Sequence, residues 1–186
     1  GHFVHPSEGI HPGIVVIHDV WGLQDHYRDV AGRFADAGFA ALAVNLYRRE
    51  SELKISDPGR WIRALDDGRV LADVKAAIDF LSGHDAVGGK PVGVVGFCYG
   101  GGVANTLAVR LPDLAAAVPF YGVAPAVADV PKIKAPLLIH FAATDERINA
   151  SWPAYEAALK ANNIAHTAYT SAGTNHGFHN DTTPRY

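Results

Sequence analysis

The pentapeptide Gly96-Phe97-Cys98-Tyr99-Gly100 closes an apolar run and opens a predicted helix. Small residues on both sides of a nucleophile at a strand-to-helix turn are what a nucleophile elbow requires. The turn is sharp, so side chains two positions before and two positions after the nucleophile would collide, and glycine at both positions removes that collision. The central residue of such a turn is usually serine. Here it is Cys98, the only cysteine of the chain, and the stretch predicts an α/β fold with a reactive thiol.

Apolar runs that read as buried strands alternate with helical patterns along the rest of the chain. The predicted strands cover residues 14–18, 40–44, 92–97, 115–121, 136–142 and 166–170. The predicted helices cover residues 27–37, 70–81, 99–110 and 152–162, and the polar stretch 47–67 is predicted to cross the surface, partly as helix. This alternation is typical of a mostly parallel sheet with helices on both faces. The length favours a single domain, residues 1–186.

Two of the predicted helices carry apolar stripes that should face the core. In the first, Val30, Phe34 and Ala37 share one face, and Gly38 is expected to end the helix. In the second, the stripe consists of Val70, Val74, Ile78 and Leu81.

Composition and charge limit the classes of function. The net charge is −3 and no block of five or more basic residues occurs, so we expect no nucleic-acid partner. No apolar stretch reaches the about 18 residues that a membrane span needs, so no membrane partner is expected. A single cysteine cannot form an intramolecular disulfide, which favours a reducing compartment and predicts the cytoplasm. Neither an HExxH motif nor a cluster with ligand spacing occurs, so we expect no metal.

A thiol, a carboxylate and an imidazole follow three different predicted strands, in the order Cys98, Asp145, His176. The carboxyl ends of parallel strands meet at one edge of a sheet, so these side chains are expected to converge. A free thiol has a pKa of about 8.5, so a histidine that takes its proton would raise the thiolate population. A carboxylate on the other ring nitrogen would fix the tautomer of that histidine. The order is that of nucleophile, acid and base in α/β-hydrolases.

Acyl transfer also needs donors for the oxyanion that develops on the substrate. The Tyr99 N–H, directly after the nucleophile, is the first expected donor. The Val20 N–H is the second, because it lies in the loop after the first clear strand.

Several stretches together carry a resemblance to a known family: residues 16–22, 38–41 with 45–47, 96–101, 120–122, 142–145 and 175–178. They resemble the dienelactone hydrolase (carboxymethylenebutenolidase) family, a cysteine-dependent branch of the α/β-hydrolases. The resemblance runs from about residue 14 to the end and implies the α/β-hydrolase fold with nucleophile Cys98, acid Asp145 and base His176. Because the family normally has extra strands before Ile14 and a final helix, we expect terminal elements to be missing here.

The resemblance also implies residues that act on the thiol and on the substrate. In the family a glutamate of the first loop helps to switch the cysteine to thiolate, and Asp19 stands at its position. Arginines bind the substrate carboxylate, and one of them lies shortly after the histidine, where this chain has Asn180. Arg147 is the candidate substitute, and Arg60 or Arg63 could supply the other contact.

Ordinary structural roles remain open for each candidate. Cys98 also fits a small buried hydrophobe, Asp145 a helix cap and Asp19 an ordinary loop carboxylate. Only geometry separates His176 from His140 and His179. Three aromatic residues fit either the lining of a substrate pocket or plain core packing, namely Trp21, Tyr47 and Tyr121.

The expected reaction is hydrolysis of a small ester or lactone through an acyl-enzyme on Cys98. For dienelactone the resemblance implies maleylacetate as the product, formed without a cofactor. Two alternatives stay open: the same triad acting on another small ester or thioester, and a non-catalytic protein with Cys98 as a redox-sensitive thiol. The sequence leaves the oligomeric state open.

Overall fold

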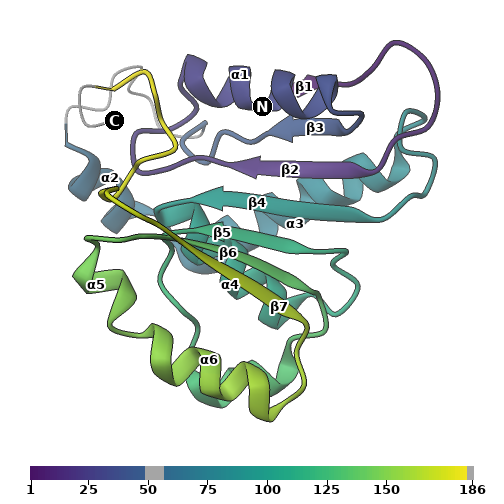
Figure 1. The fold of residues 1–186 in the computed structure, drawn as a ribbon. Coiled ribbons are helices and arrows are strands. Elements are labelled where there is room, and N and C mark those ends of the chain that lie inside the picture. The colour runs from purple at the N-terminus through teal and green to yellow at the C-terminus, as the bar shows by residue number, and fades with distance from the viewer. Residues whose placement is uncertain (49–56, 184–186) are drawn as a thin grey trace. The chain divides into compact units, whose positions relative to one another are not determined.

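The computed structural model describes residues 1–48 and 57–183, which form two compact units, residues 1–93 and 94–186. Each unit combines parallel strands with helices (Figure 1). Nothing is described for the side chain of Arg63, one of the arginine candidates.

The N-terminal unit is built on three strands. Strand β2 pairs in parallel with β3, with Ile14 opposite Ala41, and β1 pairs antiparallel with the other edge of β3. All five residues of β2 are buried, as a continuous apolar strand predicts. The elements are β1 (His2–Val4), β2 (Gly13–Ile17), α1 (Asp25–Asp36), β3 (Ala40–Ala43), α2 (Pro58–Ala64) and α3 (Asp67–Gly83).

The buried face of α1 differs from the predicted one. Tyr27 and Ala31 are fully buried, whereas Val30 and Phe34 are half-buried and Ala37 is exposed. The prediction counted only apolar side chains, but the hydroxyl of Tyr27 accepts a hydrogen bond from the Asp19 N–H at 3.2 Å, so this ring can be buried without loss. In α3 the buried stripe is Val70, Val74, Ala77 and Leu81, with Ile78 half-buried.

The C-terminal unit holds four parallel strands in the order β4-β5-β6-β7. Helix α4 packs against β5, and α6 packs against η1. The elements are β4 (Val92–Phe97, in this unit from Val94), α4 (Tyr99–Arg110), β5 (Ala117–Phe120), η1 (Val127–Lys132), β6 (Leu137–Ala142), α5 (Glu146–Asn149), α6 (Trp152–Ala161) and β7 (His166–Ser171).

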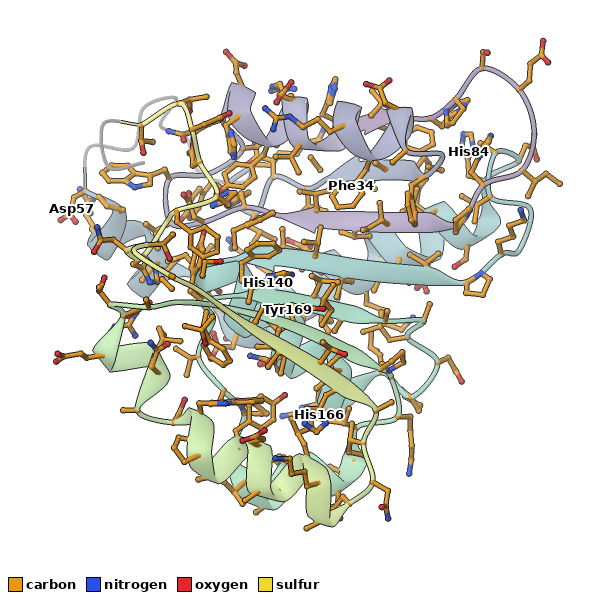
Figure 2. All side chains as sticks on the ribbon, viewed as in Figure 1. Phe34, Asp57, His84, His140, His166 and Tyr169 are labelled. Atoms are coloured by element: carbon orange, nitrogen blue, oxygen red, sulfur yellow. The ribbon has the colours of Figure 1, made fainter. Side chains whose placement is uncertain are left out.

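One row of aromatic rings crosses all four strands of this unit. Phe97, Phe120, His140 and Tyr169 are register partners on successive strands. Their ring centroids are 4.9, 4.2 and 5.8 Å apart in that order, and Figure 2 labels the last two residues. Cross-strand aromatic pairs stabilise a sheet, so this row helps to fix the register at the end of β4, one residue before Cys98.

The predicted α/β fold with mostly parallel strands is confirmed, and β4 and α4 begin and end where the sequence predicts. Three short elements were not predicted: β1, η1 and α5. Among the described residues no helix has both the length and the apolar character that crossing a membrane requires.

Candidate active site

Cys98 occupies a strained turn between β4 and α4. Its backbone has φ 56° and ψ −111°, a region that residues other than glycine rarely adopt. A Cβ atom placed on Gly96 would lie 1.9 Å from the carbonyl oxygen of Gly100, which no side chain can tolerate. Glycine at position 96 therefore permits the sharp turn that the sequence predicts. Backbone strain like that of Cys98 is concentrated at functional sites.

The first turn of α4 is held tightly against the loop that follows β5. A Cβ atom on Gly101 would lie 2.5 Å from the Phe120 oxygen, and one on Gly122 would lie 2.1 Å from the carbonyl carbon of Gly101. The Cys98 N–H also donates to the Phe120 oxygen at 3.1 Å. The strand β5 thus fixes the backbone that carries the half-buried thiol and the Tyr99 N–H beside it.

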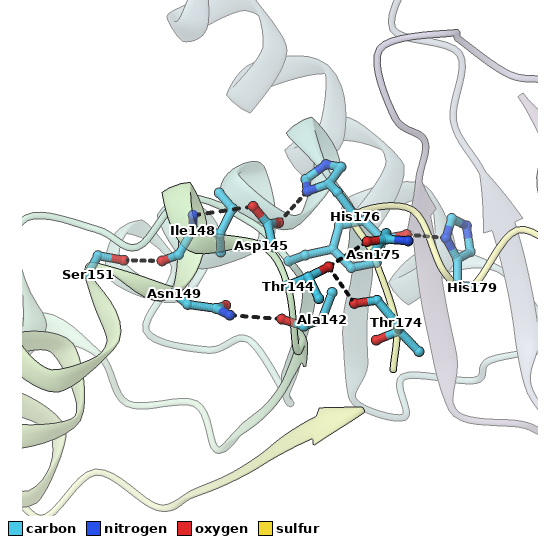
Figure 3. Close-up of polar contacts among 11 residues, drawn as sticks. Ala142, Thr144, Asp145, Ile148, Asn149, Ser151, Thr174, Asn175, His176 and His179 are labelled. Atoms are coloured by element: carbon cyan, nitrogen blue, oxygen red, sulfur yellow. Dashed lines mark hydrogen bonds and ion pairs between the residues drawn. The ribbon is translucent and has the colours of Figure 1, made fainter. Parts of the chain in front are cut away.

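Asp145 and His176 meet from the loops after β6 and β7. His176 Nδ1 donates a hydrogen bond to Asp145 Oδ2 (Figure 3). The acid is buried, with an exposed fraction of 8%, whereas about a third of the His176 side chain is exposed. Asp145 Oδ1 also accepts the Ile148 N–H at 3.4 Å, so the carboxylate caps α5 as well. Bound in this way at Nδ1, the imidazole has Nε2 as the nitrogen that can accept a proton.

Hydrogen bonds between the two loops hold this pair together. Both the N–H and the hydroxyl of Thr144 donate to the Thr174 oxygen, at 3.1 and 3.0 Å. The Thr144 hydroxyl also contacts the Asn175 side-chain amide (Figure 3). Thr144 and Asn175 directly precede Asp145 and His176, so the contact restrains each member of the pair through its neighbour. The sequence does not predict these hydrogen bonds between the two loops, since threonine and asparagine are common in loops.

Tyr121 is buried, and its ring lies against that of His176. Its side chain is buried with an exposed fraction of 1%, and its ring centroid is 4.7 Å from that of His176. Its hydroxyl forms a hydrogen bond with His179 Nδ1, and the His179 ring stacks on Phe97 at 4.0 Å. The contact of Tyr121 with the substrate stays a prediction. The structure adds a contact of its ring with the imidazole of His176.

The other histidines that the sequence left open occupy different positions. His179 pairs with Tyr121, and His140 belongs to the aromatic row on β6. Burial lowers the pKa of His140 from its ordinary value. The geometry therefore favours His176 as the partner of Asp145.

The predicted residues of the first loop lie in the N-terminal unit. The Asp19 carboxylate accepts the Trp21 N–H at 2.8 Å, and the Tyr47 hydroxyl donates to the Val20 oxygen at 3.0 Å. Trp21 is 43% exposed, whereas Tyr47 is 6% exposed. The action of Asp19 on the thiol, the Val20 oxyanion contact and the substrate contacts of the two aromatic residues stay predictions.

Among the arginine candidates, Arg147 is exposed on α5, two residues after Asp145, and Arg60 is exposed on α2. Asn180, which stands near the position of a family arginine, is buried. Its side-chain oxygen accepts the N–H and the hydroxyl of Thr182 at 3.0 and 2.6 Å, so it closes a turn. In the described ranges no group of three or more His, Cys, Asp or Glu residues could hold a metal ion.

Comparison with known proteins shows which family the chain belongs to. The chain is 31% identical over 184 residues to a candidate 2-oxo-3-(5-oxofuran-2-ylidene)propanoate lactonase of a Bradyrhizobium species, covering 90% of this chain and 73% of that protein. It is 30% identical over 208 residues to a candidate carboxymethylenebutenolidase of Synechocystis, covering all of this chain and 83% of that protein.

A solved structure agrees with these relatives. The crystal structure of a candidate dienelactone hydrolase from Klebsiella pneumoniae superposes with a TM-score of 0.83 at 25% identity, over 98% of this chain and 83% of that one. The sequence profile described as the dienelactone hydrolase family matches residues 1–186. With the elbow at Cys98 and the paired Asp145 and His176 already described, the protein is a hydrolase that belongs to the dienelactone hydrolase family.

Proposed function

We propose that the protein hydrolyses small enol lactones of the dienelactone type through a triad of Cys98, His176 and Asp145. The hydrogen bond from His176 Nδ1 to the buried Asp145 carboxylate is the observation that carries the proposal. A redox-sensing thiol does not need a carboxylate and an imidazole together, whereas nucleophilic catalysis by a triad uses both.

The chemistry follows from the groups on the two loops and the elbow. His176 Nε2 takes the thiol proton, and Cys98 Sγ forms a bond to the lactone carbonyl carbon. The carbonyl oxygen becomes an oxyanion that accepts from the N–H groups of Tyr99 and Val20. The C–O bond of the lactone then breaks, and the leaving oxygen takes the proton from His176.

Deacylation repeats the same steps with water as the nucleophile. His176 removes a proton from water, the hydroxide attacks the thioester carbonyl, and the C–S bond breaks. The acid product leaves and the thiol proton returns from His176. Asp145 stays ionised throughout and stabilises the imidazolium that forms twice in each turnover. For dienelactone the released enol then tautomerises to the ketone, maleylacetate, and the chain's own groups suffice for the hydrolytic steps.

The substrate class rests on the relatives and on one side chain. The names of both sequence relatives refer to lactone hydrolysis. Arg147 is exposed two residues after Asp145, where a guanidinium could pair with a substrate carboxylate. The other proposed substrate contacts come from Tyr121, Trp21 and Tyr47, and Asp19 is proposed to assist thiolate formation.

Three further features belong to the proposal. The two units act together as one hydrolase domain. The substrate is a small molecule, and neither nucleic acid nor a membrane is needed. The third feature is the location: a single cysteine favours a reducing compartment, and we propose the cytoplasm.

A hydrolysis screen tests the proposal. Cis- and trans-dienelactone, a p-nitrophenyl ester and a thioester are offered to the wild type and to Cys98→Ala. We expect the anionic lactones to have the highest kcat/KM and the variant to lose turnover while it keeps the wild-type circular dichroism. Broad activity on neutral esters or thioesters would favour the alternative substrates, and full turnover by a folded Cys98→Ala variant would refute the proposal.

A further inference from the structure

His18 bridges two loops of the N-terminal unit from a fully buried position. It directly follows β2 and its exposed fraction is 0%. Its Nδ1 lies 2.6 Å from the Asp19 carbonyl oxygen, and its Nε2 lies 3.1 Å from the Leu46 backbone nitrogen, in the loop after β3. Both ring nitrogens are therefore engaged with main-chain groups.

The chemistry of these partners fixes the tautomer of the ring. An amide N–H can only donate, so Nε2 must be the acceptor of the Leu46 bond. The proton then resides on Nδ1, which donates to the Asp19 carbonyl oxygen. Burial agrees with this neutral form, because it lowers the pKa of His18 to about 4.

The hydrogen bond from His18 to the Asp19 oxygen also restrains the N–H of the next residue, Val20. The Asp19 carbonyl and the Val20 N–H belong to one peptide group, and the described chain contains no cis peptide bond. In a trans peptide the C=O and the N–H point in opposite directions. A donor that holds the Asp19 oxygen therefore determines where the Val20 N–H points.

The backbone N–H groups of Val20's neighbours in this loop already have hydrogen-bond acceptors. The Asp19 N–H donates to the Tyr27 hydroxyl at 3.2 Å, the Trp21 N–H to the Asp19 carboxylate at 2.8 Å, and the Gly22 N–H to the Asp19 carbonyl oxygen at 3.4 Å. Within the described ranges the Val20 N–H is the only one of the four without an acceptor. A fixed N–H with no partner is the property that an oxyanion donor needs.

We propose that His18 is a positioning residue for the oxyanion donor, acting through its hydrogen bond to the Asp19 oxygen to fix the orientation of the Val20 N–H. The inference rests on the proposed function, since it gives a role to the Val20 donor of that mechanism. Tyr47 also restrains the backbone of Val20, because its hydroxyl donates a hydrogen bond to the Val20 oxygen at 3.0 Å.

Two substitutions separate the two bonds of His18. Asparagine places an amide N–H near the position of Nδ1, so His18→Asn can keep the bond to the Asp19 oxygen and lose the bond to Leu46. Glutamine places an amide oxygen near the position of Nε2, so His18→Gln can keep the Leu46 bond and lose the Asp19 bond. His18→Phe keeps a ring of similar size and loses both.

The test compares two reactions of Cys98. Hydrolysis of p-nitrophenyl acetate needs the oxyanion hole, whereas alkylation by iodoacetamide forms no oxyanion and reports the thiolate alone. We expect kcat/KM to fall about 100-fold in His18→Phe and His18→Gln, the order of magnitude that one oxyanion donor contributes. In His18→Asn it should stay within about fivefold of the wild type, and all three variants should alkylate at the wild-type rate.

Equal kcat/KM for the asparagine and glutamine variants would overturn the inference, as would a parallel loss of alkylation and hydrolysis. The comparison of these two polar variants decides the question even where His18→Phe does not fold. The proposed function is judged separately: a Cys98→Ala variant without turnover leaves it standing whatever the His18 variants do, and full turnover in that variant removes it.

Discussion

Thr144 donates two hydrogen bonds to one carbonyl oxygen of Thr174, from its N–H at 3.1 Å and from its hydroxyl at 3.0 Å. These bonds join the loop that ends in Asp145 to the loop that leads into His176. The pairing of acid and base thus depends on a contact between the residues just before them. The Thr144 hydroxyl also lies against the Asn175 side-chain oxygen, so it contacts the residue just before His176 as well.

Removing the Thr144 hydroxyl should loosen the pair without removing either member. Thr144→Val keeps the shape of the side chain, and a neutral hydrogen bond contributes about 1 kcal/mol. We expect kcat/KM to fall roughly fivefold, in line with that free energy, with the larger change in kcat. Thr144→Ser keeps the hydroxyl and serves as the control. Equal rates for the two variants in steady-state hydrolysis would show that the hydroxyl has no part in catalysis.

Alanine is predicted to have opposite effects on stability at Gly96, in the elbow, and at Gly32, in α1. Gly96→Ala should destabilise the protein by about 3 kcal/mol or more, because the new Cβ would lie 1.9 Å from a backbone oxygen that cannot move aside. Gly32→Ala, inside α1 with no atom within 4 Å of the new Cβ, should stabilise it by about 0.5–1 kcal/mol. Urea unfolding followed by circular dichroism measures both, and a similar change in the two variants would contradict the tight turn.

The buried His18 predicts a loss of stability in acid. Its pKa is about 4 in the folded protein and about 6.5 in the unfolded chain, so between these values the unfolded chain binds the extra proton. The free energy of unfolding therefore falls as the pH drops from 6.5 to 4, by about 3 kcal/mol from this group. His18→Asn cannot titrate at this position, so its unfolding free energy should fall less over the same range. Parallel pH profiles of the two proteins would rule out this contribution.

Asp145 is predicted to act through its charge. Asp145→Asn keeps the size of the side chain and an oxygen for the α5 cap, but it no longer stabilises an imidazolium. We expect kcat to drop on the order of 10³- to 10⁴-fold, as in other triads that lose their acid. Asp129→Asn, at an exposed carboxylate paired with Lys132 at 2.5 Å, is the matched control and should keep the wild-type rate. A similar small effect of both substitutions on hydrolysis would exclude Asp145 as the acid.

The sequence predicts what is encoded locally. The continuous apolar run of β2 and the glycines around Cys98 determine a buried strand and a sharp turn without reference to the rest of the chain. The meeting of Asp145 with His176 is also predictable, because both follow parallel strands and such strands end at one edge of a sheet.

Contacts that depend on the approach of distant segments could not be predicted. The strand β1 has three residues and forms only by pairing with β3. The burial of Tyr27 depends on the Asp19 N–H that its hydroxyl meets, and the role of Thr144 depends on how close two loops come. The bridge made by His18 likewise needs Leu46, which is 28 positions away in the sequence.

The central claim is that Cys98 carries the acyl group during turnover. Mixing the wild type with p-nitrophenyl acetate, quenching in acid within the first turnover and mapping the peptides by mass spectrometry tests it most directly. The account predicts an acetyl group on the peptide that contains Cys98, and none on the same peptide of Cys98→Ala. Steady hydrolysis with no acyl group on Cys98, or with the label on another residue, would contradict it.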